Sequence, residues 1–255
     1  MNNLEKTLYK LKKEKKKAIS IFLTAGYPNV NTTEKLIIEI EKYSDIIELG
    51  IPFSDPIADG PTIQYSSQKA LENNVNLEKC FSIVKNIRKK TKIPVILMGY
   101  LNPIYNYGLN AFFSKSHKTG VDGIIIPDLP FEESSLIRKL AKKYNIAYIP
   151  LVALTSGLKR AEKISKISTG FIYVTAVTGI TGARAELSDE LIPFLKKLKN
   201  KTSKPLFVGF GISKPEHIEK LKKYCEGFII GSAIISLIKK KKSIINFLKY
   251  ITRNI

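Results

Sequence analysis

The feature that most constrains the fold of this chain is a regular alternation of short, apolar, β-rich runs with longer amphipathic segments. Eight runs have the pattern of buried strands, at Ala18–Thr24, Asp45–Gly50, Pro94–Tyr100, Gly123–Pro127, Ala147–Val152, Phe171–Thr175, Pro205–Gly209 and Gly227–Ile230. Helical patterns occur at Thr33–Lys42, Thr62–Asn73, Leu77–Lys90, Ala111–Thr119, Glu133–Tyr144, Lys159–Ile167, Asp189–Leu198, Pro215–Lys222 and from Ser243 onward. Such alternation indicates parallel strands joined by crossover helices. Eight units in about 250 residues predict a closed (β/α)8 TIM barrel.

No Gly-, Ser- or Pro-rich linker interrupts this pattern, so residues 1–255 are expected to form a single TIM-barrel domain. Asn3–Lys15 is predicted to form an extra helix before the first strand. The alternative is an open, doubly wound sheet, which requires a glycine-rich G-x-G-x-x-G turn after its first strand. The first predicted strand ends instead in TAGYP, residues 24–28, and this sequence favours the barrel.

The chain has a net charge of +20, from 42 Lys and Arg against 22 Asp and Glu, which raises the question of nucleic-acid binding. Only five of the basic residues are arginine, and the lysines are scattered in pairs over the helix-like segments. A specific binder is expected to gather its charge on one face, with arginine and aromatic side chains among the lysines. We therefore predict no specific nucleic-acid partner and interpret Lys12 to Lys17 as a solvated face.

Cysteine and histidine are scarce, which excludes two classes of small stabilised fold. Cys80, Cys225, His117 and His217 are the only residues of these types, too few for a disulfide scaffold or a Cys/His zinc site. The longest nearly apolar run, Gly227–Ile238, is shorter than the roughly 20 residues that span a membrane. The basic start of the chain lacks an apolar signal region. We expect a cytoplasmic protein with no metal and no membrane partner.

The most informative stretch is ELGIPFSDPIADGPTIQ, residues 48–64, because it follows the second predicted strand. Active sites of such barrels lie at the carboxyl ends of the strands. A period of two places Ile46, Glu48 and Gly50 on one face of this strand. A Glu48 buried in the barrel mouth would have a raised pKa, which suits proton transfer. The alternative is a structural Glu48 at a solvent-facing strand end.

Two further acids, Asp55 and Asp59, follow in the same stretch. The prolines and glycine around them make this segment a loop rather than a helix. Two carboxylates on one rim of a barrel can divide the acid and base roles of a reaction. Asp55 by itself is equally well explained as the cap of an Asx turn.

Glycines recur after the last three predicted strands. GITG (179–182) follows the sixth strand, GFG (209–211) overlaps the end of the seventh, and Gly231 with Ser232 follows the eighth and opens a helical stretch. In barrels, backbone N–H groups of such loops and of a helix N-terminus often hold a phosphate. Each glycine alone is consistent with an ordinary turn, but their joint placement predicts a phosphate site.

Apolar and aromatic side chains occur at the strand ends between the acids and the glycines. Each of them is consistent with plain core, but together they indicate a flat aromatic group in the substrate rather than a bare sugar. The candidates are Phe22, Met98, Tyr100, Ile125, Tyr173 and Phe210.

These motifs resemble one family, the tryptophan synthase alpha chains. Residues 48–64 are very similar to the family signature, and TAGYP, IPVILMGYLNP, VDGIIIPDLPFEES, YVTAVTGITGAR, VGFGIS and GSAII occur in the family's order and spacing. The resemblance covers residues 18–238, nearly the whole chain. It implies a lyase of L-tryptophan biosynthesis that cleaves indole-3-glycerol phosphate to indole and glyceraldehyde 3-phosphate. The reaction is a retro-aldol cleavage with no cofactor in this chain.

Carried over residue by residue, the resemblance implies that Glu48 and Asp59 are catalytic. It implies a phosphate site formed by Gly182, Gly211, Gly231 and Ser232, and an indole pocket formed by Phe22, Tyr100, Ile125, Tyr173 and Phe210. Two departures were found: TAGYP where some members have an acid before the proline, and TAVTG where some have an arginine two residues before the glycine. Neither changes the acids or the phosphate glycines.

The same resemblance implies a partner, the pyridoxal-phosphate-dependent beta chain, in an αββα assembly. The contact loops would be Pro52–Pro61, with Asp55 at the interface, and Gly179–Leu187, which could close as a lid. Two other classes of protein stay open. A non-catalytic activating subunit is one, and the intact Glu48 and Asp59 argue against it. A neighbouring phosphosugar barrel is the other, and it would share the glycines but not the seventeen-residue signature.

Overall fold

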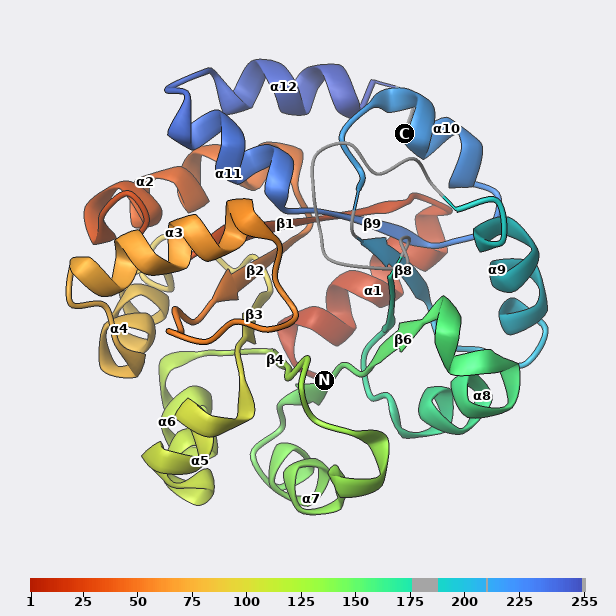
Figure 1. Ribbon diagram of the computed structural model, residues 1–255, viewed down its shortest axis with the longest axis horizontal. Helices are drawn as coiled ribbons and strands as arrows, with labels where there is room; N and C mark the ends of the chain where they lie inside the picture. The colour runs from red at the N-terminus through yellow and green to blue at the C-terminus, as the bar shows by residue number, and fades with distance from the viewer. Residues whose placement is uncertain (176–187, 210, 254–255) are drawn as a thin grey trace.

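The computed structural model describes residues 1–175, 188–209 and 211–253 and shows a parallel sheet curled into a barrel within a ring of helices (Figure 1). The strands are β1 (Ala18–Thr24), β2 (Ile46–Gly50), β3 (Val95–Met98), β4 (Gly123–Ile125), β5 (Ala147–Tyr148), β6 (Leu151–Ala153), β7 (Ile172–Thr175), β8 (Leu206–Gly209) and β9 (Gly227–Ile230). The helices are α1 (Asn3–Glu14), α2 (Val30–Ile40), α3 (Pro61–Glu72), α4 (Leu77–Ile87), α5 (Leu101–Tyr107), α6 (Leu109–Thr119), α7 (Ser135–Lys143), α8 (Gly157–Ile167), α9 (Leu191–Lys199), α10 (Pro215–Leu221), α11 (Ser232–Lys239) and α12 (Ile244–Ile251). Short 3-10 turns occur at η1 (Glu41–Tyr43), η2 (Phe131–Glu133) and η3 (Leu154–Ser156).

The sheet closes on itself, as the alternation of strands and helices predicted. Its strand pairings are parallel, in the order β5-β4-β3-β2-β1-β9-β8-β7-β6. The two ends of this order, β5 and β6, are separated along the chain only by Ile149 and Pro150. Ile149 N–H donates to the carbonyl of Ile124 in β4 at 3.0 Å. The Pro150 carbonyl accepts from the N–H of Tyr173 in β7 at 3.1 Å. This short segment therefore joins both ends of the sheet.

The fifth predicted strand, Ala147–Val152, differs from the observed structure because it is split into β5 and β6. Pro150 lies at the break and has no N–H with which to continue the ladder. The helix α5, which contains Pro103, was not predicted. That proline lies in the first turn, where backbone N–H groups have no partner within the helix in any case.

The barrel interior is filled by side chains from neighbouring strands. Residues paired across parallel strands point to the same face of the sheet, and Phe22, Glu48 and Ile96 form one such row across β1, β2 and β3. Nearer the amino ends of the strands, the rings of Phe171 and Phe207 stack with their centroids 4.0 Å apart. The interior is therefore a packed core, and the space for a ligand lies at the carboxyl ends of the strands.

The predicted N-terminal helix is present as α1, which lies behind the barrel in Figure 1. Its Leu4 side chain is fully buried, and Leu4 Cδ2 would lie 3.3 Å from a Cβ built on Gly170, ahead of β7. Asp122, ahead of β4, holds the start of the helix. Its Oδ1 accepts a hydrogen bond of 3.0 Å from Asn3 N–H, and its Oδ2 accepts one of 2.6 Å from Arg88 Nη2. The helix α1 therefore covers the end of the barrel opposite the carboxyl ends of the strands.

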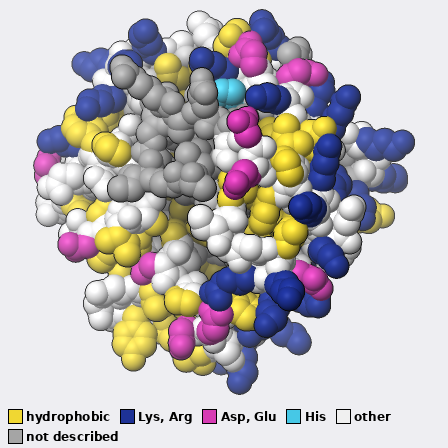
Figure 2. Space-filling model, turned by 45° about the vertical axis from the view of Figure 1, so that its right-hand side comes forward, with side chains coloured by type: hydrophobic (Ala, Val, Ile, Leu, Met, Phe, Trp, Pro, Cys, Tyr) yellow, Lys and Arg dark blue, Asp and Glu magenta, His cyan; other side chains and the backbone are white. Residues whose placement is uncertain are grey.

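Basic side chains are spread over the outside of the molecule. On the face shown in Figure 2, Lys and Arg side chains occur around the edge, with acidic and hydrophobic side chains among them. Some of the lysines have acidic partners, such as Lys16 with Glu14 at 3.0 Å and Lys199 with Glu226 at 2.5 Å. Within the three described ranges, no helix combines the length and the apolar character needed to cross a membrane.

Candidate active site

Glu48 lies inside the barrel, at the third of the five residues of β2. Its side chain is fully buried, beside Phe22 of β1 and Ile96 of β3 in register. The hydroxyl of Ser20, which is also on β1 and fully buried, donates a hydrogen bond of 2.7 Å to Glu48 Oε1. The other oxygen, Oε2, has no hydrogen-bond partner among the residues that the structure describes. The prediction of a buried Glu48 is confirmed, and the solvent-facing alternative is wrong.

Burial controls the proton affinity of Glu48. Removal from water disfavours the charged carboxylate and raises the pKa of Glu48 to about 8, although the Ser20 hydrogen bond acts in the opposite direction. Glu48 therefore holds its proton at neutral pH. The pKa of Tyr173 is raised well above its ordinary value by burial and by the nearby Glu48 and Asp59 carboxylates, so its hydroxyl also stays neutral.

Asp59 lies in the loop 51–60 between β2 and α3. As its prolines and glycine predicted, this loop contains neither helix nor strand. Side chains of α3 anchor it at both ends. Gln64 Nε2 donates to the Asp59 carbonyl at 2.8 Å, while Ser67 Oγ donates to the Phe53 carbonyl at 3.0 Å and accepts from Phe53 N–H at 2.8 Å. The loop is thus held against α3 on either side of the segment that ends in Asp59.

Tyr100, just after β3, extends across to the carboxyl group of Asp59. Its hydroxyl donates to Asp59 Oδ2 at 2.9 Å and accepts from Ala58 N–H at 3.0 Å. Burial raises the pKa of Asp59 to about 6, and the hydrogen bond from Tyr100 limits this rise. Asp59 is therefore mostly ionised at neutral pH, where Glu48 is mostly protonated. The two carboxyl groups thus offer opposite protonation states in one site, as an acid–base pair requires.

An elongated cavity lies over the carboxyl ends of the strands, with Asp59 near its middle. It consists of two adjoining hollows of about 470 and 340 Å³, mouths included, which share Phe22, Asp59, Ile63 and Met98 in their linings. The smaller hollow extends to Tyr100 after β3. The larger one extends to the ends of β7, β8 and β9, where it is lined by Tyr173, Gly211, Ile212, Ile229, Gly231 and Ser232.

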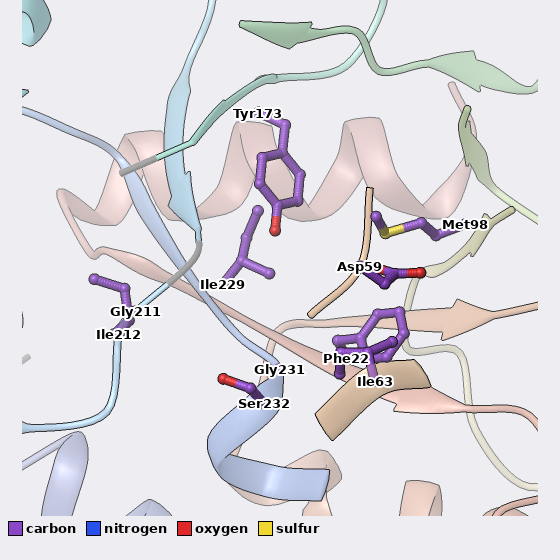
Figure 3. Close-up of a pocket in the computed structure, with 10 residues that line it drawn as sticks. All are labelled: Phe22, Asp59, Ile63, Met98, Tyr173, Gly211, Ile212, Ile229, Gly231 and Ser232. Atoms are coloured by element: carbon purple, nitrogen blue, oxygen red, sulfur yellow. The ribbon is translucent and has the colours of Figure 1, made fainter. Parts of the chain in front are cut away.

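Figure 3 shows how the larger hollow is formed. The ring of Tyr173 projects from β7 into it, with Asp59 on one side and Ser232, at the start of α11, on the other. Tyr173 fits there because residue 209 is glycine: a Cβ at Gly209 would lie only 2.3 Å from the Tyr173 hydroxyl oxygen. Gly211 has a φ of +86°, in the left-handed region that favours glycine.

Gly231 differs from these two glycines because packing does not require it. Its φ is −118°, and the nearest neighbour of an added Cβ would be Phe22 Cβ at 3.4 Å, an ordinary contact. An anion that approaches the backbone closely would, in contrast, need the space. Gly231 is the N-cap of α11 and Ser232 is its first residue, so unpaired N–H groups at this helix start lie at the cavity wall.

The structure brings most of the predicted site residues together. Those lining the cavity are Phe22, Asp59, Met98, Tyr100, Tyr173, Gly211, Gly231 and Ser232. Ile125 is fully buried beside Met98 in register, and Glu48 is fully buried beside Phe22, but neither is among the described residues that line either hollow. Asp55 is exposed on the loop surface. Gly182, Phe210 and the loop Gly179–Leu187 lie wholly outside the described residues.

Sequence analysis missed several residues of the site. Ile63, Ile212 and Ile229 line the cavity, but an isolated isoleucine in an apolar segment gives no functional signal. Ser20 could have been found. It is the only hydroxyl residue within AISIFL, two positions before Phe22, so the period of two places it on the same inward face.

The closed barrel, with a cavity over the carboxyl ends of its strands and the two carboxyl groups of raised pKa, has the architecture of enzymes of the (β/α)8-barrel class. Residues 8–252 match the family model described as "Tryptophan synthase alpha chain". The chain belongs to this family. Its members are lyases that cleave indole-3-glycerol phosphate to indole and glyceraldehyde 3-phosphate, the alpha reaction of L-tryptophan biosynthesis.

Individual relatives agree with the family model. The tryptophan synthase alpha chain of Caldanaerobacter subterraneus subsp. tengcongensis is 45% identical over 241 residues, which covers 94% of this chain and 92% of that protein. Among solved structures, the tryptophan synthase subunit alpha of Legionella pneumophila str. Paris has a TM-score of 0.84 at 34% identity, covering 98% of this chain and 94% of that one. A chain of the tryptophan synthase complex from Pyrococcus furiosus has a TM-score of 0.86 at 34% identity, covering 92% and 98%. The predicted fold, family and reaction are thus confirmed.

Proposed function

We propose that this chain performs the family's reaction with Glu48 as the proton carrier and Asp59 as the negative charge beside the indole nitrogen. The observation that most directly supports these roles is the difference in proton affinity between two carboxyl groups of one site. The pKa of Glu48 is raised to about 8 and that of Asp59 to about 6. Retro-aldol cleavage needs an acid to protonate indole C3 and a negative charge to stabilise the cation that results.

The proton path begins and ends on Glu48. The carboxylic acid delivers its proton to C3 of the indole, and the positive charge spreads to the ring nitrogen, where Asp59 stabilises it. Glu48, now a carboxylate, takes the proton from the hydroxyl on the adjacent side-chain carbon. As that carbon becomes a carbonyl, the carbon–carbon bond breaks and its electrons restore the neutral indole ring. Glu48 is then protonated again, ready for the next substrate.

The long cavity suits the shape of this substrate. We place the phosphate at the end lined by Gly211, Gly231 and Ser232, where backbone N–H groups and the start of α11 favour an anion. The indole then extends toward Phe22 and Tyr100, so that its nitrogen lies near Asp59 at the middle of the cavity. Of the residues outside the described ranges, the proposal assigns Gly182 to the phosphate and Phe210 to the indole.

We propose further that this chain needs no cofactor, since each step above is a proton transfer between a side chain and the substrate. Pyridoxal phosphate belongs to the beta chain of this family. For location we propose the cytoplasm. Cys80 and Cys225 are buried and free, and burial raises the pKa of both thiols to about 12, which suits a reducing compartment. One core that includes Leu4 and Ile251 supports a single domain over 1–255.

The partner that we propose is a beta chain, in an αββα assembly, docked over the carboxyl ends of the strands. Three of the six large hydrophobic side chains exposed in the described part of the chain follow consecutive strands: Ile57 after β2, Tyr105 after β3 and Leu136 after β4. Ile57 is 77% exposed and lies two residues before Asp59. An apolar partner surface would cover these side chains and steady the catalytic loop. The similar P. furiosus chain was solved in a tryptophan synthase complex. Asp55, exposed on the same loop, and the loop Gly179–Leu187 complete the proposed interface.

The partner is tested by titrating a beta chain into a fixed amount of this protein while indole formation is followed. The rate should rise to a plateau, and Ile57→Ser should shift the titration midpoint to at least about tenfold higher beta-chain concentration, because it removes a buried anchor. Tyr250→Ser, an exposed aromatic of α12, is the matched control and should leave the midpoint unchanged. A flat titration with the wild-type chain would mean that the protein works alone.

The catalytic roles are tested with Glu48→Gln and Asp59→Asn, which keep the side-chain shape but cannot exchange protons as carboxyl groups do. Acid–base groups contribute about 10²–10⁴-fold to a rate, so indole formation should fall by this order while the circular dichroism of the fold is retained. Glu133→Gln changes an exposed carboxylate and should keep the wild-type rate. Near-normal cleavage by either carboxamide variant would remove that residue from the mechanism.

A further inference from the structure

The Glu48 carboxyl group has one hydrogen bond that the described residues show, from the hydroxyl of Ser20 to Oε1. We propose that Ser20 is a positioning residue, which holds Glu48 Oε1 so that Oε2 exchanges protons with the substrate, and which stabilises the carboxylate formed midway through the reaction. This inference rests on the catalytic role proposed for Glu48 and adds a second residue to it.

The residues beside Ser20 in the sheet offer its hydroxyl no other hydrogen-bond partner. In register its neighbours are Ile46 of β2 and Ile229 of β9, both apolar, and its hydroxyl hydrogen is donated to Glu48. Ser20 is fully buried and lies two positions before Phe22 on β1, one inward row further from the carboxyl ends of the strands than Glu48, so it does not touch the substrate in the proposed arrangement. Any effect of this hydroxyl on the reaction therefore passes through Glu48.

The direction of the hydrogen bond bears on which oxygen carries the proton. With Ser20 as the donor and Oε1 as the acceptor, the oxygen left to carry the hydrogen of the acid is Oε2, which has no described partner. Without the hydroxyl, the apolar neighbours Phe22 and Ile96 would leave the rotation of the carboxyl group undefined. Near-attack geometry requires such rotation to be restricted before the proton moves.

The Ser20 hydrogen bond should have a measurable effect on the pKa of Glu48. The titratable group that interacts electrostatically with Glu48 is Tyr173 from β7, and Asp59 from the loop after β2 interacts with the same tyrosine. The Ser20 bond lowers the pKa of Glu48 against the larger effect of burial. Loss of this bond would raise that pKa further and destabilise the carboxylate intermediate.

The experiment compares the wild type with Ser20→Ala and Ser20→Cys in single-turnover cleavage of indole-3-glycerol phosphate as a function of pH. The wild-type rate constant should fall above about pH 8, where Glu48 loses its proton. For Ser20→Ala we expect a rate constant about tenfold to a hundredfold lower, and an alkaline limb moved up by about one pH unit. The substrate concentration for half-saturation should stay within about twofold. Ser20→Cys, with a weaker donor of similar size, should give intermediate values.

The matched control is Ser116→Ala, which removes another buried hydroxyl, far along the chain on α6. It should leave the rate and the limb unchanged. If Glu48→Gln is inactive but Ser20→Ala has the wild-type rate and limb, the inference is overturned while the role of Glu48 stands. If Ser20→Ala has a lower rate and a lower melting temperature but an unchanged alkaline limb, the role of Ser20 is purely structural. That result would overturn the inference as well. Near-normal activity of Glu48→Gln would overturn both proposals.

Discussion

Glu48→Gln should gain stability relative to the wild type as the pH rises, even as it loses activity. The reason is the native pKa of Glu48, about 8, against the ordinary value of 4.5 expected in the unfolded chain. Between these values the native protein holds a proton that the unfolded chain has released. The raised native pKa therefore contributes stability that is fully present below pH 4.5 and is lost progressively until pH 8. In this window the free energy of unfolding falls by about 1.4 kcal/mol per pH unit.

The size of the effect follows from the burial of this one side chain. From pH 4.5 to pH 7 the loss amounts to about 3 kcal/mol, and no solvent screening reduces it because Glu48 is fully buried. Glutamine cannot ionise, so the variant lacks this slope. Its amide has a different hydrogen-bonding requirement from the carboxyl group, but that offset is the same at every pH. The difference in unfolding free energy between variant and wild type should therefore grow by about 3 kcal/mol over this range.

The assay is urea unfolding followed by circular dichroism at pH 5, 6 and 7 for the wild type, Glu48→Gln and Glu133→Gln. The last variant removes the same charge from an exposed position, so its difference from the wild type should not change with pH in this way. A pH-independent difference for Glu48→Gln would refute the reasoning, because it would mean that native Glu48 titrates as it does in the unfolded chain.

Three further predictions concern the rest of the site and the surface charge. Tyr100→Phe removes the hydrogen bond that limits the pKa of Asp59, so the acidic limb of the pH–rate profile should move up from near pH 6 by about one unit; an unmoved limb would contradict the assignment. Gly231→Ala places a Cβ only in ordinary contact with Phe22, so the melting temperature should hold while affinity for substrate and for inorganic phosphate falls about tenfold; unchanged affinity in calorimetry would exclude Gly231 from the phosphate site. The charge of +20 should give only weak binding to nucleic acids that disappears with added salt, and sequence-selective binding at physiological salt in a filter assay would overturn this view.

The fold could be predicted because buried parallel strands have nearly continuous apolar sequences, which alternate here with amphipathic helices. The exceptions involve proline. Pro150 lies within an apolar run that looks continuous, yet its missing N–H splits the strand into β5 and β6. Pro103 has the opposite effect, since it suggests a break but lies in the first turn of α5, which tolerates it. The sequence shows where a proline is. Only the hydrogen bonding of the strand or helix around it shows whether the N–H that proline lacks would have made a hydrogen bond.

The site could be predicted in part. A period of two placed Glu48 on one face of its strand without deciding whether that face was inward, and the turn-forming residues were enough to place Asp59 in a loop. Their proton affinities depend on contacts distant in sequence, which no local pattern contains: Ser20 is 28 residues from Glu48, and Tyr100 is 41 from Asp59. Sequence analysis assigned Tyr100 to the indole pocket only, whereas the structure shows that its hydroxyl also holds the catalytic loop.

The position of α1 affects how the chain must assemble during synthesis. This helix is made before the strands of the barrel, but the carboxylate that receives the Asn3 N–H belongs to Asp122, 119 residues later, and the buried site of Leu4 adjoins Gly170. Until those residues have been translated, the apolar side of the helix, with Leu4 and Leu11, has nothing to cover it. Domains generally fold as units. Here α1 can complete its packing only after Gly170 has been made, so its docking must come late in the assembly of the barrel.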